Sequence, residues 1–136
     1  MDEVVDHKRR IAAFLDQFGR ERDLTLPPLS PEGTGSIQRG SAIVTIHVLA
    51  DKGVLLLLSK LAKAPALDAA RAKRLLQLSF VDTGDAAFAL HPQTGDLYLR
   101  ILRGLDGLDY GEFEELVHSI AKTADAWDDK LAAELA

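Results

Sequence analysis

The 136-residue sequence contains no cysteine. Disulfide frameworks, cysteine nucleophiles and thiolate metal sites are therefore excluded, and the composition fits a reducing cytoplasm. No apolar run approaches the ~18 residues of a membrane-spanning helix. The longest aliphatic run, Val54–Leu58, has the length of a strand. The acidic start, Met1-Asp2-Glu3, lacks the pattern of a signal peptide. We therefore expect a single cytoplasmic domain, residues 1–136, with no membrane-inserted segment.

Catalytic and metal-binding motifs are also lacking. The four histidines, His7, His47, His91 and His118, show no metal-ligand spacing. His7 and His118 have carboxylates at helical spacing and are predicted to make surface contacts. No serine lies in a Gly-x-Ser-x-Gly motif, and Gly33-Thr34-Gly35 lacks the Lys-Ser/Thr of a phosphate-binding loop. The sequence predicts no enzyme, cofactor or metal site. A small-ligand enzyme would need a deep polar pocket lined by His47 or His91.

Negative charge is concentrated near the C-terminus. From Asp109 to Ala136, eight acidic residues and two lysines give a charge of −6, whereas the whole chain carries −5. The rest of the chain is therefore close to neutral, at +1. An acidic face repels phosphate backbones and anionic membranes, so we expect no nucleic-acid partner.

Three segments have the apolar spacing of amphipathic helices. The first, Val4–Phe18, is expected to end at Gly19, and the second spans Leu67–Leu78. The third begins at Asp109, which can cap it together with Glu112 in a capping box. Its apolar stripe consists of Phe113, Leu116, Val117, Ile120, Ala124, Trp127 and Leu131. Alanines in the second helix either reflect helix propensity or allow a second copy of this helix to pack closely.

Five segments have the composition or alternation of strands. In chain order they are Ile37–Arg39, Ala42–Leu49, Gly53–Leu61, Asp85–His91 and Asp96–Arg103. Leu24–Leu26 is a further short candidate, and Glu32–Ser36 has the composition of a loop. Val54–Leu58 is apolar on both faces, which indicates a central strand covered by the closing helix on one side and by a partner on the other. The prediction is an α+β fold in the order α-β-β-β-α-β-β-α, with a mostly antiparallel twisted sheet packed against helices.

Such apolar surface favours a binding protein, because an isolated domain would leave it exposed. An extended apolar segment of another protein can add a strand to a sheet edge, with pockets taking alternate side chains. The nature of the partner does not follow from composition or spacing.

The order and spacing of these elements resemble those of the class I type III secretion chaperones, the Tir chaperone family. The similarity covers most of the chain. It is strongest in Ala64-Pro65, Leu75–Phe80, Gly84–Leu90, Thr94–Leu99 and Leu108–Phe113. This sequence has Ser79 where the family pattern often has asparagine.

The resemblance implies a homodimer that binds the N-terminal segment of a secreted effector in extended form, without ATP. The implied two-fold interface consists of Leu75, Leu76, Leu78, Phe80 and Phe88. The implied effector-binding residues, on the first helix and the adjoining sheet, are Ile11, Leu15, Phe18, Ile46 and Val48. The five interface residues are equally compatible with an ordinary core. For the five effector-binding residues an ordinary core is the favoured interpretation, because periodicity does not show whether the chain itself or a client covers an apolar face. Components of the secretion apparatus are further candidate partners, and an adaptor that sequesters a folded regulator of secretion or transcription is the alternative function.

Overall fold

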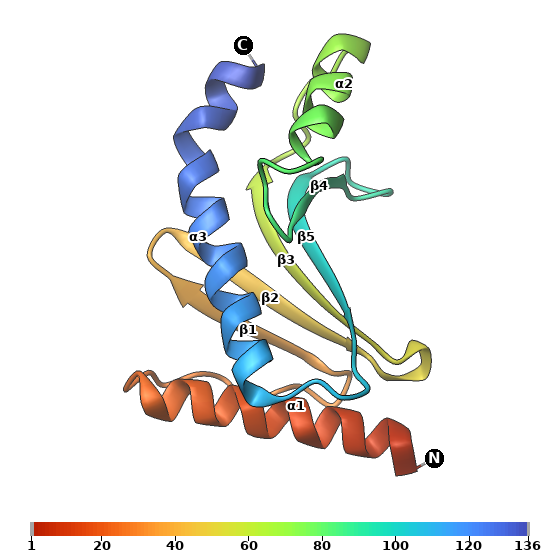
Figure 1. The fold of residues 1–136 in the computed structure, drawn as a ribbon, viewed down its shortest axis with the longest axis vertical. Helices are drawn as coiled ribbons and strands as arrows, with labels where there is room; N and C mark the ends of the chain where they lie inside the picture. The colour runs from red at the N-terminus through yellow and green to blue at the C-terminus, as the bar shows by residue number, and fades with distance from the viewer. Residues whose placement is uncertain (1, 136) are drawn as a thin grey trace.

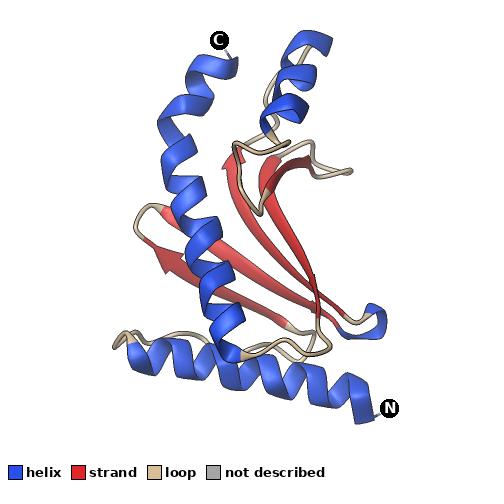
Figure 2. Cartoon of the chain, viewed as in Figure 1, coloured by secondary structure: helices blue, strands red, loops and turns tan. Residues whose placement is uncertain are grey.

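The computed structural model describes residues 2–135, with side chains from residue 6 onward. Within these residues, three helices, five strands and a short 3-10 helix follow one another in the predicted order (Figures 1 and 2). They are α1 (Asp2–Glu21), β1 (Thr34–Arg39), β2 (Ala42–Leu49), η1 (Ala50–Lys52), β3 (Val54–Ala62), α2 (Ala69–Leu78), β4 (Ala87–Leu90), β5 (Leu97–Gly104) and α3 (Tyr110–Leu135). The predicted α+β fold is confirmed.

The described strands form one antiparallel sheet in the order β1-β2-β3-β5-β4, so β3 lies at its centre. Leu57 of β3 pairs with Ile46 of β2 on one side and with Ile101 of β5 on the other. These three side chains are buried on the same face of the sheet. The strong twist of the sheet is visible in Figure 1.

Helix α3 runs along the twisted sheet and packs mainly on β2, β3 and β5, while α1 lies across the end of the sheet near the start of α3 (Figure 2). The predicted apolar stripe of α3 is buried along its whole length, from Phe113 to Leu131. It packs against inward-facing residues of the central strands, including Val44, Leu55 and Leu99. Burial of this stripe contributes to the apolar stabilisation of the fold.

Local hydrogen bonds set the helix ends. Asp109 caps α3 as predicted, because the Glu112 backbone N–H donates to Asp109 Oδ1 at 2.8 Å. The return bond of a capping box, from the Asp109 N–H to the Glu112 side chain, is not formed. In α2, the Arg71 N–H donates to Asp68 Oδ1 at 2.8 Å, so this helix begins after Asp68 and not at the predicted Leu67.

The predicted end of α1 at Gly19 is wrong. The helix continues to Glu21, and Asp23 then adopts a left-handed conformation with φ of 57°. The Leu24 N–H donates back to the Gly19 carbonyl at 2.8 Å, as in a Schellman motif. The left-handed residue that ends the helix is therefore Asp23, whereas Gly19 was the predicted end.

Two strand predictions near the N-terminus are also wrong. Leu24–Leu26 forms no strand, and β1 begins at Thr34, inside the segment predicted as a loop. Thr34 pairs with His47, and the Val48 N–H donates to the Gly33 carbonyl at 2.7 Å. The partner strand β2 thus imposes an extended backbone on a loop-like sequence at the sheet edge.

The outer face of the sheet, opposite α3, is covered by no described element. In β3, Leu55 and Leu57 are buried, whereas Leu56 and Leu58 on the outer face are only half-buried. Ile43 and Leu102 on the same face are exposed. A partner that covers this second face remains a prediction.

Candidate functional site

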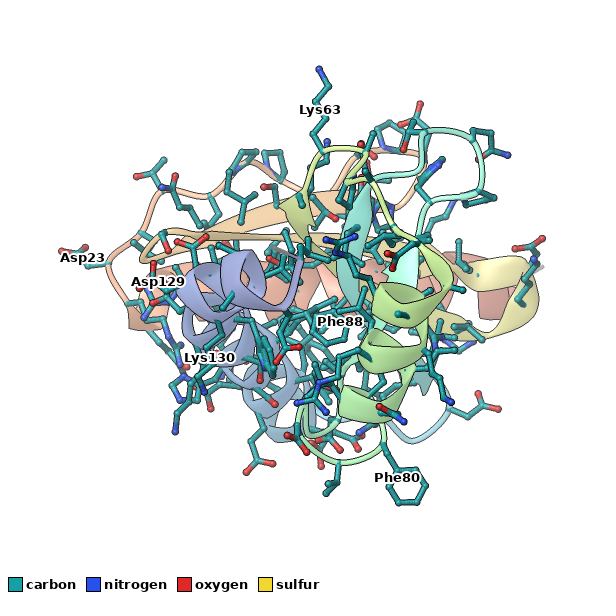
Figure 3. All side chains as sticks on the ribbon, turned by 90° about the horizontal axis from the view of Figure 1, so that it is seen from above. Asp23, Lys63, Phe80, Phe88, Asp129 and Lys130 are labelled. Carbon is teal, nitrogen blue, oxygen red and sulfur yellow. The ribbon has the colours of Figure 1, made fainter. Side chains whose placement is uncertain are left out.

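Helix α2 stands at the upper end of the sheet, beside the C-terminal half of α3 (Figure 1). Four large apolar side chains around it face solvent: Leu76, Phe80, Val81 and Leu90 are 72%, 92%, 71% and 50% exposed. We call these four residues the α2 patch. Figure 3 shows Phe80 pointing away from the molecule. A cluster of apolar side chains this exposed is a feature of protein–protein contact surfaces.

An apolar hollow of about 240 Å³ adjoins the α2 patch. It lies between α2 and β4, and Leu76 and Leu90 belong to both features. Its other lining residues include Leu67, Leu75, Phe88 and Leu97. The patch and the hollow together form one continuous apolar surface.

The predicted interface residues occupy this one region. Leu76 and Phe80 are exposed, whereas Leu75, Leu78 and Phe88 lie beneath them in the core. Phe88 stacks edge-on against Trp127 of α3, with ring centroids 5.4 Å apart. Contact of these residues with a second copy of the chain stays a prediction.

Ser79 joins α2 to the sheet. Its hydroxyl donates to the Leu75 carbonyl at 2.9 Å and accepts from the Phe88 N–H at 3.0 Å. The hydroxyl thus links the last turn of α2 to the edge strand β4. Sequence reasoning noted this position only as a departure from the family pattern and missed its role.

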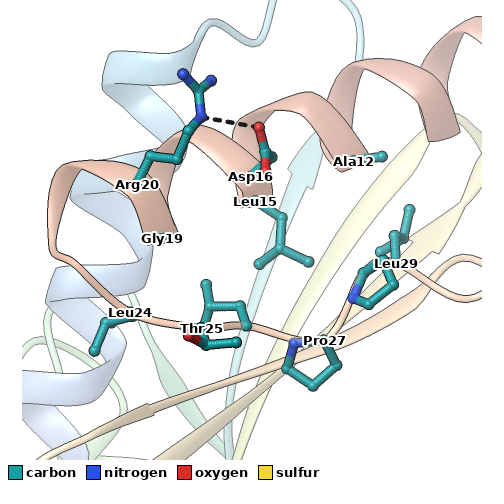
Figure 4. Close-up of a pocket in the computed structure, with 11 residues that line it drawn as sticks. Ala12, Leu15, Asp16, Gly19, Arg20, Leu24, Thr25, Pro27 and Leu29 are labelled. Carbon is teal, nitrogen blue, oxygen red and sulfur yellow. Dashed lines mark hydrogen bonds and ion pairs between the residues drawn. The ribbon is translucent and has the colours of Figure 1, made fainter.

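The predicted effector-binding residues are all core residues in this structure. Ile11, Leu15, Phe18, Ile46 and Val48 are 4% exposed or less. Leu15 also borders an open hollow, which we call the α1 groove (Figure 4), and Phe18 borders a separate hollow against α3. The role of these five residues in effector binding stays a prediction.

The α1 groove has a volume of about 380 Å³ and lies between α1 and residues 24–29. Leu24, Leu26 and Leu29 are half-buried along it. An ion pair between Arg20 Nε and Asp16 Oδ2, 3.0 Å apart, lies on its rim (Figure 4). Such a groove can accept apolar side chains of an extended segment.

The outer face of the sheet carries an open concavity lined by Ile43, Leu58 and Tyr98, with His47 and His91 beside them. His47 Nε2 hydrogen-bonds Thr45 Oγ1 at 3.1 Å, and burial lowers the pKa of His47. His91 Nδ1 accepts from two backbone N–H groups of its own turn. Both histidines thus lie in an open concavity whose lining also includes Ser41, Thr45 and Lys60. Among the described residues, no group of three His, Cys, Asp or Glu side chains could hold a metal ion.

The surface prediction for His7 is wrong, whereas His118 is exposed as expected. His7 is buried, with Nε2 4.0 Å from Asp106 Oδ1. Arg10, one turn further along α1, donates to the Leu105 carbonyl. The loop before α3 thus covers this part of α1, a contact between residues far apart in sequence.

A polar network joins the end of α1 to the start of α3. The Tyr110 hydroxyl donates to Glu21 Oε1 at 2.6 Å, and Arg22 Nη2 donates to Glu114 Oε2 at 2.6 Å. Burial, and then the hydrogen bond to Glu21, raise the pKa of Tyr110 to about 12. The network therefore favours the neutral phenol in the folded state.

This pKa predicts a loss of stability in strong alkali. The folded-state pKa lies above the ordinary value of 10.0, so the stabilisation is complete below about pH 10 and is lost as the pH rises to about 12. In urea titrations, we expect the free energy of unfolding of the wild type to fall over this window, and Tyr110→Phe to show a smaller fall. Tyr98→Phe serves as the matched control and should follow the wild type. Parallel curves for wild type and Tyr110→Phe would contradict the prediction.

A small α+β domain with large exposed apolar patches has the features of a protein that binds other polypeptides. A family model for the Tir chaperone protein (CesT) family matches residues 13–128, and the chain belongs to this family. No curated protein sequence matches the chain. No helix in residues 2–135 is long and apolar enough to cross a membrane.

Solved structures with a similar fold include chaperone–effector complexes. A chain of the ExsC–ExsE complex is 21% identical, with a TM-score of 0.74, and the match covers 90% of this chain and 93% of that chain. A chain of the HopA1–SchA chaperone–effector complex is 14% identical, with a TM-score of 0.69 and coverage of 90% and 95%. A chain of the heterodimeric ExoU–SpcU complex, from the type III secretion system of Pseudomonas aeruginosa, is 18% identical, with a TM-score of 0.63 and coverage of 88% and 95%. At these identities the likeness shows the fold.

Proposed function

We propose that this protein is a cytoplasmic, ATP-independent chaperone that binds the N-terminal segment of one or more type III secreted effectors and keeps it extended and secretion-competent. Membership of the Tir chaperone family carries the proposal. The exposed α2 patch and the open α1 groove support it, because the first is apolar surface, and the second a hollow lined in part by apolar side chains, that this chain does not cover by itself.

In this proposal the α2 patch lies at the two-fold interface of a homodimer. An isologous interface uses the same surface of both copies, so an apolar helix end beside an apolar hollow can serve as its own partner. Leu76 and Phe80 would make the contact across the axis, and Leu75, Leu78 and Phe88 would support them from beneath. The second copy would cover the side chains that are most exposed here.

The client segment would lie over α1 and the adjoining sheet. The α1 groove offers Leu15 at its surface, while Ile11, Phe18, Ile46 and Val48 form the layer below. An extended segment alternates its side chains, so every second one could enter such a groove. Ordering a disordered client has an entropic cost, which a long contact over the dimer would offset.

Light scattering of the protein, alone and co-expressed with N-terminal segments of candidate secreted proteins, tests the proposal. We expect a dimer of about twice the 14.8 kDa chain mass, which retains one extended segment with or without Mg-ATP. A wild-type monomer at micromolar concentration that retains no segment would contradict the proposal.

Limited proteolysis of the complex separates a chaperone from an adaptor. A held N-terminal tail should resist protease only while it is bound, because it has no fold of its own. A folded regulator of secretion or transcription would resist protease after release as well. The second outcome would favour the adaptor.

A further inference from the structure

Another open hollow, of about 590 Å³, lies between the end of α1, the β1–β2 turn and the middle of α3. Its lining shares no residue with the α1 groove or the α2 patch. The charged or titratable lining residues are Arg22, Arg39, His118, Lys122 and Asp125. We call this feature the cationic hollow, because three permanent cations face one carboxylate.

The positive charge of the hollow is only partly neutralised. Arg22 pairs with Glu114 at 2.6 Å and with Glu21 at 3.7 Å, and Asp125 accepts a hydrogen bond from the Ser41 hydroxyl. Arg39 and Lys122 form no ion pair with any described residue. In a chain with a net charge of −5, whose α3 segment is acidic, this local excess of positive charge runs against the overall charge. Such a site attracts an anionic group that the rest of the surface repels.

The two guanidinium groups of the hollow are held in position by neighbouring side chains. The Arg22 guanidinium lies 3.8 Å, and that of Arg39 5.9 Å, from the centroid of the buried Phe18 ring. The ion pair with Glu114 fixes Arg22 further. Ordered guanidinium groups lose less entropy on binding, and their planar fork suits a carboxylate.

Apolar surface lies beside these cations. Phe18 and Ala121 form its floor and are almost fully buried, so the apolar surface open to a ligand consists mainly of the aliphatic stems of the lining arginines and lysine. A ligand for this hollow therefore combines a carboxylate with an adjacent apolar group. Both are found together in a polypeptide that carries Asp or Glu next to an apolar residue.

We propose that the cationic hollow docks an aspartate or glutamate side chain, flanked by an apolar residue, from a polypeptide partner. The assignment rests on the chaperone function proposed above, in which the polypeptide partner is the extended client segment. Arg39 and Lys122 bind the carboxylate, and the aliphatic stems of the lining arginines and lysine contact the neighbouring apolar side chain. The hollow thereby selects clients with an acidic–apolar pair at this point of their path.

Amide NMR spectra of the full-length protein test this site directly. The probes are the capped peptide acetyl-Ala-Leu-Glu-Leu-Ala-amide, the same peptide with Gln in place of Glu, and inorganic phosphate. We expect the glutamate peptide to shift the amide signals of residues near 18, 39 and 118–125, and the glutamine peptide to bind about tenfold more weakly, since a charge-assisted hydrogen bond is lost. Arg39→Gln and Lys122→Gln should each weaken the binding of the glutamate peptide by a similar factor. Lys63→Gln is the control, because it removes one cation from an exposed position remote from the hollow (Figure 3). It should leave the binding of the glutamate peptide unchanged.

Three results would overturn the proposal. One is equal binding of the two peptides, and another is unchanged binding of the glutamate peptide to both Arg39→Gln and Lys122→Gln. The third is the same set of shifts with inorganic phosphate at equal or lower concentration, which would make the hollow a phosphate site. If an effector segment is retained equally by Arg39→Gln, Lys122→Gln and wild type, the hollow plays no part and the chaperone function stands. If the glutamate peptide binds but no secreted segment is retained, the site stands and the chaperone function fails.

Discussion

Leu76→Asp is expected to convert the proposed homodimer into a monomer. Leu76 is largely exposed in the single chain, so a carboxylate is tolerated there without loss of the fold. In a two-fold interface, the substitution places two carboxylates in an apolar contact, where each loses its hydration without gaining a partner. Loss of a central apolar contact from both copies should weaken the dimer at least about 100-fold. Light scattering at micromolar concentration measures the change.

Leu102→Asp is the matched control for this experiment. Leu102 is also an exposed leucine, but it lies on the outer face of β5, away from the α2 patch. The control should remain a dimer, and both variants should keep the circular dichroism spectrum of the wild type. A Leu76→Asp protein that is still dimeric at the same concentration would show that the α2 patch is not the interface.

Phe113→Ala should cause a large loss of stability. Phe113 is fully buried at the junction of α1 and α3. Its ring centroid lies 5.7 Å from that of Phe14, 6.5 Å from that of Phe18 and 6.4 Å from that of Tyr110. Truncation of a buried phenylalanine leaves a cavity and typically lowers the free energy of unfolding by about 3–5 kcal/mol. Urea denaturation measures this loss.

Phe80→Ala makes the same chemical change at an exposed position. Both substitutions are best compared in the Leu76→Asp background, because dimerisation would otherwise add a concentration-dependent term to the stability. In that monomer, Phe80→Ala should change the free energy of unfolding by no more than about 0.5 kcal/mol. Equal losses from the two substitutions would contradict the burial described here.

Most of the fold could be predicted because its signals are local. The apolar period of α3 and its Asp109 cap, and the β-branched run of β2, each lie within one segment of sequence. The start of β1 could not be predicted in this way. Its glycines and Thr34 are typical of a loop, and the backbone pairing with β2 makes them a strand.

The candidate surfaces were less predictable. The resemblance grouped Leu75, Leu76 and Phe80 together, but only the packed orientation of α2 shows that Leu75 is buried and that the other two are exposed. The apolar face that contains Ile11 and Phe18 is covered by the chain itself, which periodicity does not reveal. The cationic hollow had no sequence signal, since Arg39 and Lys122 belong to elements that only the fold brings together.

The few contacts that hold α2 couple its local order to the assembly of the protein. This helix packs mainly on α3 and β4, and it is held there by Leu75, Leu78 and the Ser79 hydroxyl. Detachment of α2 would break few buried contacts and would leave the core between the sheet and α3 intact, so its free energy of opening lies well below that of global unfolding. A second copy bound at the α2 patch would stabilise only the attached form. By mass action, the amide protection of α2 would then depend on the concentration of the protein itself.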